Sequence, residues 1–546
     1  MNAATLLSKC LAAQGVDRVF CVPGESYLAL LDALVDYAGQ IETITCRHEG
    51  AAAMMAEADG KMTGRPGLAM VTRGPGASNA AGGVHVAQQD STPMVLLVGQ
   101  IGLDMDGRDA FQEVDYKQLF AGMAKWVTEI RNPDRIPEII AHAWSVAMSG
   151  RPGPVVIALP EDMLSMQTDA APCAHTVVSR PAPSQESLEI LRDLLEKAEN
   201  PIAILGGSRW DEQSARHFVD FATSWDLPVA CSFRRQMLVD HHHPNYAGEV
   251  GMGLNPALRR RVKTSDLLLL VGGRLSELPS QKYDLLEIPG PNPNLVHVHP
   301  GAEELERVYQ AKLVINATPD TFLVSAPRGS LDSTRRAKSA HDEYLNWSTP
   351  VGRVPGSVQM HDVVAHLENV LDSDAIMTNG AGNYTVWMQR FHRFRQYGTQ
   401  ISPVSGSMGY GLPAAIAAGL RHPGRQILCL AGDGCFQMTG QEFATAVQYG
   451  VKLVVIVIDN GMFGTIRMHQ ERSFPGRVSA TRLQNPDFAM IARAAGGFGE
   501  TVESTVDFEP VFARACASPM PALIHLRVDA RAMTPDLSLD DIRSDG

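Results

Sequence analysis

The chain has 546 residues, of which 45% are hydrophobic and 20% are charged, and a formal net charge of -13 at pH 7. These values are those of an ordinary globular protein, and the length predicts roughly three domains, because single hydrophobic cores stop growing near about 250 to 300 residues. The acidic balance argues against nucleic acid and anionic membrane surfaces as partners, since both attract basic proteins.

The cysteines and the amino terminus bear on cellular location. The eight cysteines are scattered and include no CxxC pair, which is typical of a protein kept reduced in the cytoplasm. Gly15, Asp17 and Arg18 interrupt the first apolar stretch, so we expect no secretory signal. No apolar run has the length that a bilayer-spanning helix needs. We therefore expect a soluble, cytoplasmic protein.

Residues 1–167 are predicted to form the first domain. Helical segments alternate there with short apolar runs at 67–72, 94–98 and 154–159. Alternation of this kind predicts a parallel sheet flanked by helices. A polar, proline-rich connection over residues 168–184 then leads into the next domain.

Two further domains of the same kind are predicted. The central domain covers 185–330, with apolar runs at 201–205, 266–271 and 294–298. After a charged linker, the third domain covers 357–530, with apolar runs at 374–377, 426–430, 453–458 and 522–526. The predicted fold class is α/β, with three doubly wound parallel-sheet domains.

An acidic residue follows a short strand of the first domain. Arg47-His48-Glu49 comes directly after the strand-like run 41–46 and precedes the small-residue run 50–56. Glu49 fits an ordinary first-turn helix residue, favoured by the helix dipole. It also fits a functional acid whose pKa rises in an apolar pocket, so that it shares a proton with a ligand. Glu49 alone favours the structural interpretation, but its place between Arg47-His48 and the small-residue run favours the functional one.

The third domain carries a motif suited to phosphate and metal. Gly432-Asp433-Gly434 follows the apolar run 426–430, and Asn460 closes the apolar run 453–458. Mg²⁺ is small and hard, and a site for it commonly takes one or two protein oxygens and others from phosphate groups. The glycines allow the backbone to approach phosphate oxygens. Gly-Asp-Gly alone also fits a plain strand-turn-helix, but the downstream asparagine favours the metal site.

These motifs and several shorter ones, in the same order, make the chain similar to the acetolactate synthase and pyruvate oxidase group of thiamine diphosphate (ThDP) enzymes. The resemblance covers nearly the whole length, and it rests on the stretches 23–24, 47–52, 74–79, 90–93, 110–113, 406–409, 411–414 and 432–434. It implies that the three domains are the pyrimidine-binding, central and diphosphate-binding domains. It also implies a homo-oligomer, in which ThDP lies between the pyrimidine domain of one subunit and the diphosphate domain of another.

The resemblance assigns cofactor contacts residue by residue. Glu49 would hydrogen-bond the pyrimidine ring nitrogen and activate the cofactor, and Met408 would lie beneath it and hold its rings in a bent conformation. Asp433, Asn460 and the main-chain carbonyl of Met462 would hold Mg²⁺. The full set of implied ThDP contacts is Pro23, Gly24, Glu49, Gly382, Asn383, Gly406, Met408, Gly432, Asp433, Gly434, Asn460, Met462 and Phe463.

The same comparison suggests residues for the substrate pocket. Phe111 and Gln112 match a stretch that lines the reaction pocket, with Gln112 and Glu25 as candidates for oxygen and proton transfer. Lys125 matches a lysine near the active site of the synthases, although a solvated helix lysine fits equally well. His469 occupies the position of a tryptophan that shapes the acceptor site, and an exposed helix histidine is its other interpretation.

Departures from the synthase pattern concern the substrate anion and flavin. Leu278 stands where the synthases have an arginine that meets the substrate carboxylate. Either an anionic second substrate binds another cation, for which Lys125 and Arg467 are the candidates, or the second substrate is not an anion. Synthases bind a structural FAD in the central domain, but Gly251-Met252-Gly253 lacks their histidine and His299 replaces their acid. Gly206-Gly207 after the strand fits either a dinucleotide site or simple turn chemistry. FAD is therefore a candidate cofactor, but the sequence does not establish that the protein binds it.

The predicted function is ThDP- and Mg²⁺-dependent decarboxylation of a 2-oxo acid such as pyruvate, with carboligation to an acetolactate-type 2-hydroxy ketone. A simple decarboxylase or a C–C lyase that releases an aldehyde is the alternative, because decarboxylases place an acid at the position of Glu25. A non-catalytic ThDP-binding protein is a remote alternative, because such a protein would have lost Glu49.

Overall fold

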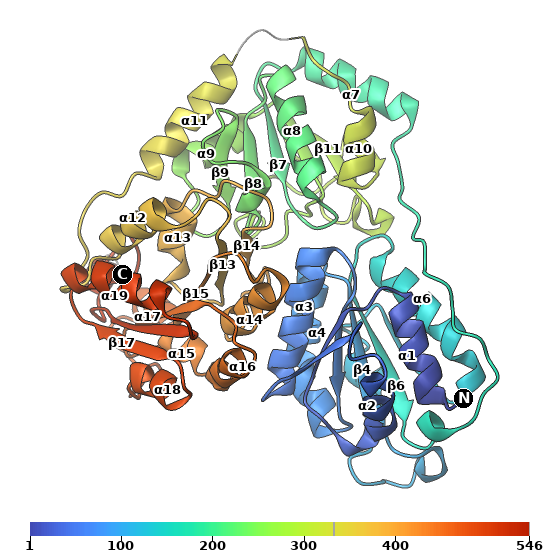
Figure 1. The fold of residues 1–546 in the computed structure, drawn as a ribbon. Coiled ribbons are helices and arrows are strands. Elements are labelled where there is room, and N and C mark those ends of the chain that lie inside the picture. Colours follow the sequence, from blue (N-terminus) through green and yellow to red (C-terminus); the bar gives the residue numbers. More distant parts are fainter. Residues whose placement is uncertain (331–333, 545–546) are drawn as a thin grey trace. The chain divides into compact units, whose positions relative to one another are not determined.

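The computed structural model describes residues 1–330 and 334–544, and within them it contains three sheets, each of six parallel strands (Figure 1). The chain divides into two compact units. The first sheet lies in the unit made of residues 1–179, 416–421 and 439–449, and the second and third sheets lie in the other unit. The predicted α/β class with three doubly wound parallel sheets is confirmed.

The first sheet has the strand order β2-β1-β3-β4-β6-β5. Its strands are β1 (Arg18–Cys21), β2 (Glu42–Thr45), β3 (Gly67–Val71), β4 (Met94–Gln100), β5 (Trp126–Glu129) and β6 (Pro154–Pro160). Its helices are α1 (Ala3–Ala13), α2 (Leu28–Val35), α3 (Glu49–Thr63), α4 (Pro75–Asp90), α5 (Tyr116–Phe120) and α6 (Ile136–Met148). The strands β3, β4 and β6 are buried throughout, as expected where helices cover both faces of a parallel sheet.

Small residues bring α3 and α4 close together, and this contact positions the start of α3. A Cβ atom at Gly83 of α4 would lie 2.4 Å from Cβ of Ala53 on α3, so only glycine fits there. The helix α3 begins at Glu49, where the Nδ1 atom of His48 accepts the Gly50 N–H at 3.0 Å as an N-cap. The small-residue run after Glu49 is therefore a packing surface, and it fixes the backbone next to the acid.

The second sheet has the order β12-β11-β10-β7-β8-β9, which is the strand order of dinucleotide-binding folds. Its strands are β7 (Pro201–Leu205), β8 (Val229–Ser232), β9 (Tyr246–Val250), β10 (Leu267–Val271), β11 (Asn294–His299) and β12 (Leu313–Asn316). The helices of this part of the chain are α7 (Gln185–Lys197), α8 (Glu212–Ser224), α9 (Pro256–Thr264), α10 (Pro319–Ser325) and α11 (Arg335–Trp347). The switch of chain direction in this sheet falls between β7 and β10.

The third sheet, in the order β14-β13-β15-β16-β18-β17, repeats the connectivity of the first. Its strands are β13 (Ile376–Asn379), β14 (Gln400–Ile401), β15 (Ile427–Gly432), β16 (Val454–Asp459), β17 (Phe498–Val502) and β18 (Ala522–Arg527). The helices of this part of the chain are α12 (Met360–Val370), α13 (Thr385–Phe391), α14 (Gly411–Arg421), α15 (Asp433–Phe436), α16 (Phe443–Gln448), α17 (Gly464–Ser473), α18 (Phe488–Ala494), α19 (Thr505–Ala517) and α20 (Leu539–Ser544). In open parallel sheets, ligands bind at the carboxyl ends of the strands where the strand order switches, here between β13 and β15.

No helix in the described part of the chain is both long enough and apolar enough to cross a lipid bilayer.

Candidate functional site

A cavity of about 320 Å³ opens at the carboxyl ends of β13, β15 and β16, where the strand order of the third sheet switches. Every residue of the third domain that the sequence analysis assigned to ThDP lines this one cavity. They are Gly382, Asn383, Gly406, Met408, Gly432, Asp433, Gly434, Asn460, Met462 and Phe463. The structure thus brings together residues that span about eighty positions of sequence.

The glycines beside Asp433 leave little room for a side chain. A Cβ atom at Gly434 would lie 2.6 Å from the Phe463 ring, and one at Gly432 would lie 3.1 Å from the Tyr384 ring. The Tyr384 hydroxyl accepts the Gly380 N–H at 3.2 Å and lies 3.5 Å from Sγ of Cys435. Tyr384 therefore supports the turn from within the core, and the two glycines keep the backbone open toward the cavity.

Asp433 is a buried carboxylate with few hydrogen-bond donors. Its Oδ1 atom accepts the Gly434 N–H at 2.9 Å, and its Oδ2 atom accepts Nδ2 of Asn485 at 2.7 Å. Burial raises the pKa of Asp433 to about 6, although both hydrogen bonds oppose the rise. A cation beside Asp433 would stabilise the negative charge of this carboxylate, which water solvates poorly.

The donor atoms near Asp433 suit Mg²⁺. The Oδ1 atom of Asn460 accepts the Met462 N–H at 3.2 Å, so the asparagine and the Met462 backbone form one turn on the cavity wall. The described residues contain no cluster of three or more His, Cys, Asp or Glu side chains that would hold a softer or more highly charged metal site. One carboxylate with amide and main-chain oxygens is the ligand type that Mg²⁺ takes together with phosphate oxygens.

Asn485 and Asp459 belong to this site and were missed by the sequence analysis. The Nδ2 atom of Asn485 donates to Asp433 and also to Oδ1 of Asp459, at 2.7 Å each. Asp459 contacts Nε2 of His525 at 2.8 Å. Burial opposes the charge of Asp459, but the hydrogen bonds from His525 and Asn485 outweigh it and lower the pKa of Asp459. Asn485 lies in a loop far from both motifs, and nothing in its spacing pointed to this contact.

In the first unit, the predicted residues Pro23, Gly24, Glu25 and Glu49 follow the carboxyl ends of β1 and β2. Glu49 is half-buried, and its Oε2 atom accepts Nδ2 of Asn79 at 2.9 Å. A Cβ atom at Gly24 would lie 2.4 Å from Cβ of Thr72, so the chain passes close to the end of β3. Asn79, which orients the Glu49 carboxylate, is the contact that the sequence analysis did not assign.

A second acid, Glu442, holds the turn before Glu49 within the same unit. It is fully buried, and its Oε1 atom accepts the N–H groups of Arg47 and His48 at 3.0 and 2.9 Å. Its Oε2 atom accepts the Thr445 hydroxyl at 2.6 Å. Because buried N–H groups need partners, Glu442 fixes the backbone that presents Glu49. Glu442 lies almost four hundred residues from Glu49 in sequence, so the sequence analysis did not predict this contact.

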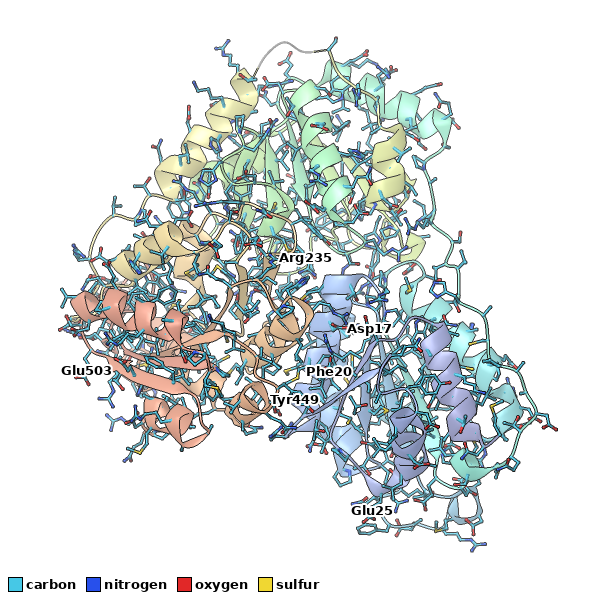
Figure 2. All side chains as sticks on the ribbon, in the orientation of Figure 1. Asp17, Phe20, Glu25, Arg235, Tyr449 and Glu503 are labelled. Atoms are coloured by element: carbon cyan, nitrogen blue, oxygen red, sulfur yellow. The ribbon has the colours of Figure 1, made fainter. Side chains whose placement is uncertain are left out.

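Glu25, Phe111 and Gln112 lie at the same end of the first sheet and are not enclosed. Glu25 is exposed and lies at the outer margin of its unit (Figure 2). Phe111 is 77% exposed. Gln112 has a φ of 65°, and its Cβ atom would lie 2.9 Å from a Cβ added at Gly74, which follows β3. An exposed apolar side chain thus lies beside a glutamine whose backbone conformation is rare for a residue other than glycine.

Lys125 and His469 are placed elsewhere. Lys125 precedes β5, so it lies at the amino end of the first sheet, opposite to the end that bears Glu49, and its Nζ atom donates to the Ser149 carbonyl at 2.6 Å. His469 is exposed on α17 and is not part of the cavity lining. The structure does not bring either residue to the groups described above.

The glycine turns at the switch point of the central sheet pack closely against each other. A Cβ atom at Gly207 would lie 1.8 Å from the Gly272 carbonyl oxygen, and Nε1 of buried Trp210 donates to the Gly206 carbonyl at 2.8 Å. His299 is buried, burial lowers its pKa to about 4, and it bonds within its own turn to Gly301. These contacts hold the two turns together within the central sheet.

Comparison with known proteins identifies the class of the chain. Family models match it in three parts: the thiamine pyrophosphate enzyme N-terminal TPP binding domain over residues 1–119, the central domain over 188–325 and the C-terminal TPP binding domain over 380–526. The chain belongs to the thiamine pyrophosphate enzyme family.

Its relatives are more specific. The chain is 31% identical to the acetolactate synthase isozyme 2 large subunit of Escherichia coli (strain K12), over 97% of this chain and 96% of that protein. It is 30% identical to the acetolactate synthase large subunit of Parasynechococcus marenigrum (strain WH8102), over 97% and 88%. It is also 30% identical to isozyme 1 of the E. coli enzyme, over 97% and 94%. The prediction of a ThDP-dependent, acetolactate synthase-like enzyme is confirmed.

Proposed function

We propose that the protein catalyses the decarboxylation of a 2-oxo acid and the ligation of the remaining acyl unit to a second carbonyl compound, with ThDP and Mg²⁺ as cofactors. The observation that carries this proposal is the convergence of Asp433, Asn460, Met408 and their glycines on one cavity at the switch point of the third sheet. ThDP, when bound, supplies the carbanion chemistry that such a reaction needs.

The residues of the second unit would bind and orient the cofactor. Asp433, the Asn460 side chain and the Met462 carbonyl would hold Mg²⁺, and the open backbone at Gly432 and Gly434 would face the diphosphate. Met408 is half-buried on the cavity wall and packs against the hydrophobic core. A thioether at this position offers a soft, apolar surface on which the rings of the cofactor can rest.

The residues of the first unit would supply the acid. Glu49, oriented by Asn79, would hydrogen-bond the pyrimidine nitrogen, and Gln112 with Glu25 would contact oxygen and proton-exchanging positions of the substrate. We propose that Glu49 of one copy acts with the cavity of a second copy in a homo-oligomer. The exposed Phe111 and the open surface around Glu25 support a covering partner.

A cytoplasmic location remains part of the proposal, and the eight free cysteines, six of them buried, support it.

Glu25 gives a second candidate function its specific support. The carboxyl group of Glu25 is exposed at the carboxyl end of the first sheet and could relay a proton from solvent to the decarboxylated donor, and the product would then be an aldehyde. Incubation with ThDP, Mg²⁺ and a panel of 2-oxo acids distinguishes the two functions, because ligation gives a 2-hydroxy ketone and protonation gives an aldehyde.

The same assay tests the acid. Glu49→Gln keeps the shape of the side chain and removes its charge, so we expect loss of CO₂ release by about 100-fold or more with ThDP still bound. Turnover of the variant at the wild-type rate would refute the proposed mechanism.

A further inference from the structure

The connection between the first and central domains, residues 168–184, contains neither helix nor strand, yet one part of it is held against α1. The contact is made by the side chain of Gln14, the buried residue that follows α1. Its Nε2 atom donates to the Ala174 carbonyl at 2.8 Å and to Sγ of Cys173 at 3.3 Å, and its Oε1 atom accepts the Thr176 N–H at 3.0 Å. These three bonds place Cys173 at the end of α1.

A second cysteine lies beside Cys173. Cys10 is on α1, four residues before Gln14, so the two side chains lie on the same face of the helix. Cys10 is fully buried in a hydrophobic core cluster, and half-buried Cys173 packs against that cluster. The two thiols are hydrogen-bonded to each other, and the Cys173 N–H donates to Sγ of Cys10. A pair of free thiols therefore bridges α1 and the connection, within the first unit.

The hydrogen bonds give the two thiols different roles. The Cys10 thiol and the Gln14 amide both donate to Cys173, and they lower the pKa of Cys173 against the opposing effect of burial. The hydrogen bond to Cys173, together with burial, raises the pKa of Cys10. Cys173 is thus the thiol that carries negative charge, and it is also the one that solvent reaches. Because the thiolate is the reactive form of cysteine, Cys173 is the nucleophile of the pair.

We propose that Cys10 and Cys173 are a redox-active pair, which hydrogen peroxide oxidises to a disulfide and cellular dithiols reduce again. This inference goes beyond the proposed function, since neither cysteine is among the residues assigned to ThDP. Disulfides in cytoplasmic proteins are usually transient and redox-sensing, so the pair is compatible with a reduced protein. The disulfide would fasten the connection covalently to α1, where hydrogen bonds and packing hold it in the reduced protein.

The oxidation takes two steps. Sγ of Cys173 attacks one peroxide oxygen, the O–O bond breaks, and a sulfenic acid and a hydroxide form, of which the hydroxide takes up a proton. The sulfur of Cys10 then attacks Sγ of Cys173, the S–O bond breaks, and the departing hydroxide takes the thiol proton of Cys10. The two sulfurs together lose two electrons, and one hydrogen peroxide with the two thiol protons becomes two water molecules. Thiol–disulfide exchange with a dithiol reverses the oxidation.

Peptide mapping without reductant gives the first test. The ThDP- and Mg²⁺-loaded protein is treated with hydrogen peroxide, the remaining thiols are alkylated, and the fragments are identified by mass spectrometry. We expect a cross-link between Cys10 and Cys173 that dithiothreitol removes, with Cys516 still reduced. Treated protein that lacks this cross-link, or that carries Cys173 as a sulfinic acid instead, overturns the proposal. The result does not depend on the proposed function, because the cross-link is detected without turnover.

Alkylation rates test which thiol is the nucleophile. Cys516 is the matched comparison within the same chain, because it is half-buried as Cys173 is, but burial raises its pKa. At pH 7 we expect iodoacetamide to modify Cys173 about tenfold or more faster than Cys516. Equal rates in the wild type overturn the assignment, whether or not any variant folds. Gln14→Leu should slow the modification of Cys173 about threefold or more and leave Cys516 unchanged, and a wild-type rate at Cys173 would refute the role of Gln14.

Variants of the cysteines separate the two oxidation steps. Cys10→Ala removes the second thiol, so peroxide should leave Cys173 as a sulfenic acid that dimedone traps. Cys173→Ser should abolish the loss of thiols at low peroxide, whereas the control Cys516→Ser should form the cross-link as the wild type does. Loss of thiols at the wild-type rate in Cys173→Ser would contradict the proposed pair.

Discussion

Removal of the Asn485 amide should weaken metal binding more than it weakens the fold. Asn485 donates to Asp433 and to Asp459 at 2.7 Å each, so one side chain joins two carboxylates that would otherwise repel each other. Asn485→Ala removes both hydrogen bonds. Hydrogen bonds to charged groups contribute about 1.5 to 3 kcal/mol each, and the one that acts on Asp433 bears on the proposed metal ligand.

The loss of that one bond corresponds to roughly a tenfold or greater weakening of Mg²⁺ binding, since about 1.4 kcal/mol is a factor of ten at 25 °C. The carboxylate of Asp433 would lose the donor that orients it, and it would face Asp459 without the intervening amide. We expect the Mg²⁺ concentration needed for half-maximal ThDP binding to rise by that factor, as measured by titration of the intrinsic fluorescence change.

A matched control separates this effect from general destabilisation. Asn245 is buried, and its Nδ2 atom donates to the Leu227 carbonyl at 2.8 Å, between the segments that lead into β9 and β8. Asn245→Ala should lower the free energy of unfolding by about 1 to 3 kcal/mol and leave the Mg²⁺ requirement unchanged. Wild-type Mg²⁺ affinity in folded Asn485→Ala would refute the reasoning.

Three further variants test other parts of the structure. Gly434→Ala places a Cβ atom 2.6 Å from the Phe463 ring and should abolish ThDP retention. The control Gly424→Ala, whose added Cβ meets no atom within 4 Å, should bind ThDP as the wild type does. Equal ThDP retention by both variants would show that the turn at Gly434 is not tightly packed. Glu442→Ala leaves the Arg47 and His48 N–H groups without their acceptor and should lower the free energy of unfolding by about 2 to 5 kcal/mol, as measured by urea denaturation; a loss below about 0.5 kcal/mol would contradict the role of Glu442 in holding this turn. Glu249→Gln keeps an acceptor for the Arg234 N–H and removes an acid whose pKa in the folded state, about 8, lies above its value in the unfolded state. The wild type should therefore lose stability as the pH rises from about 4.5 to 8, and the variant should lose less. Parallel profiles of stability against pH for the two proteins would contradict this pKa assignment.

The sequence by itself determined the fold class and predicted the third-domain residues that line the cavity. Apolar runs such as 453–458 are buried on both faces because helices cover a parallel sheet on both sides, and this signal is local. The glycines beside Asp433 and the asparagine after β16 are also local signals, because each of them lies in sequence at or directly after the end of a strand. These positions needed no knowledge of distant contacts.

The tertiary structure decided which distant residues join those local motifs. Asn485, Glu442 and Arg234 reach the motifs from other parts of the sequence, and no spacing rule relates them to Asp433 or Glu49. The structure also separates Lys125 from the motif with which the sequence analysis grouped it. This lysine precedes β5 and lies at the amino end of the first sheet, whereas Glu49 lies at the carboxyl end. Sequence patterns encode the period and ends of each element, whereas contacts between loops depend on how the strands are ordered in the sheet, and that order follows from packing of the whole domain.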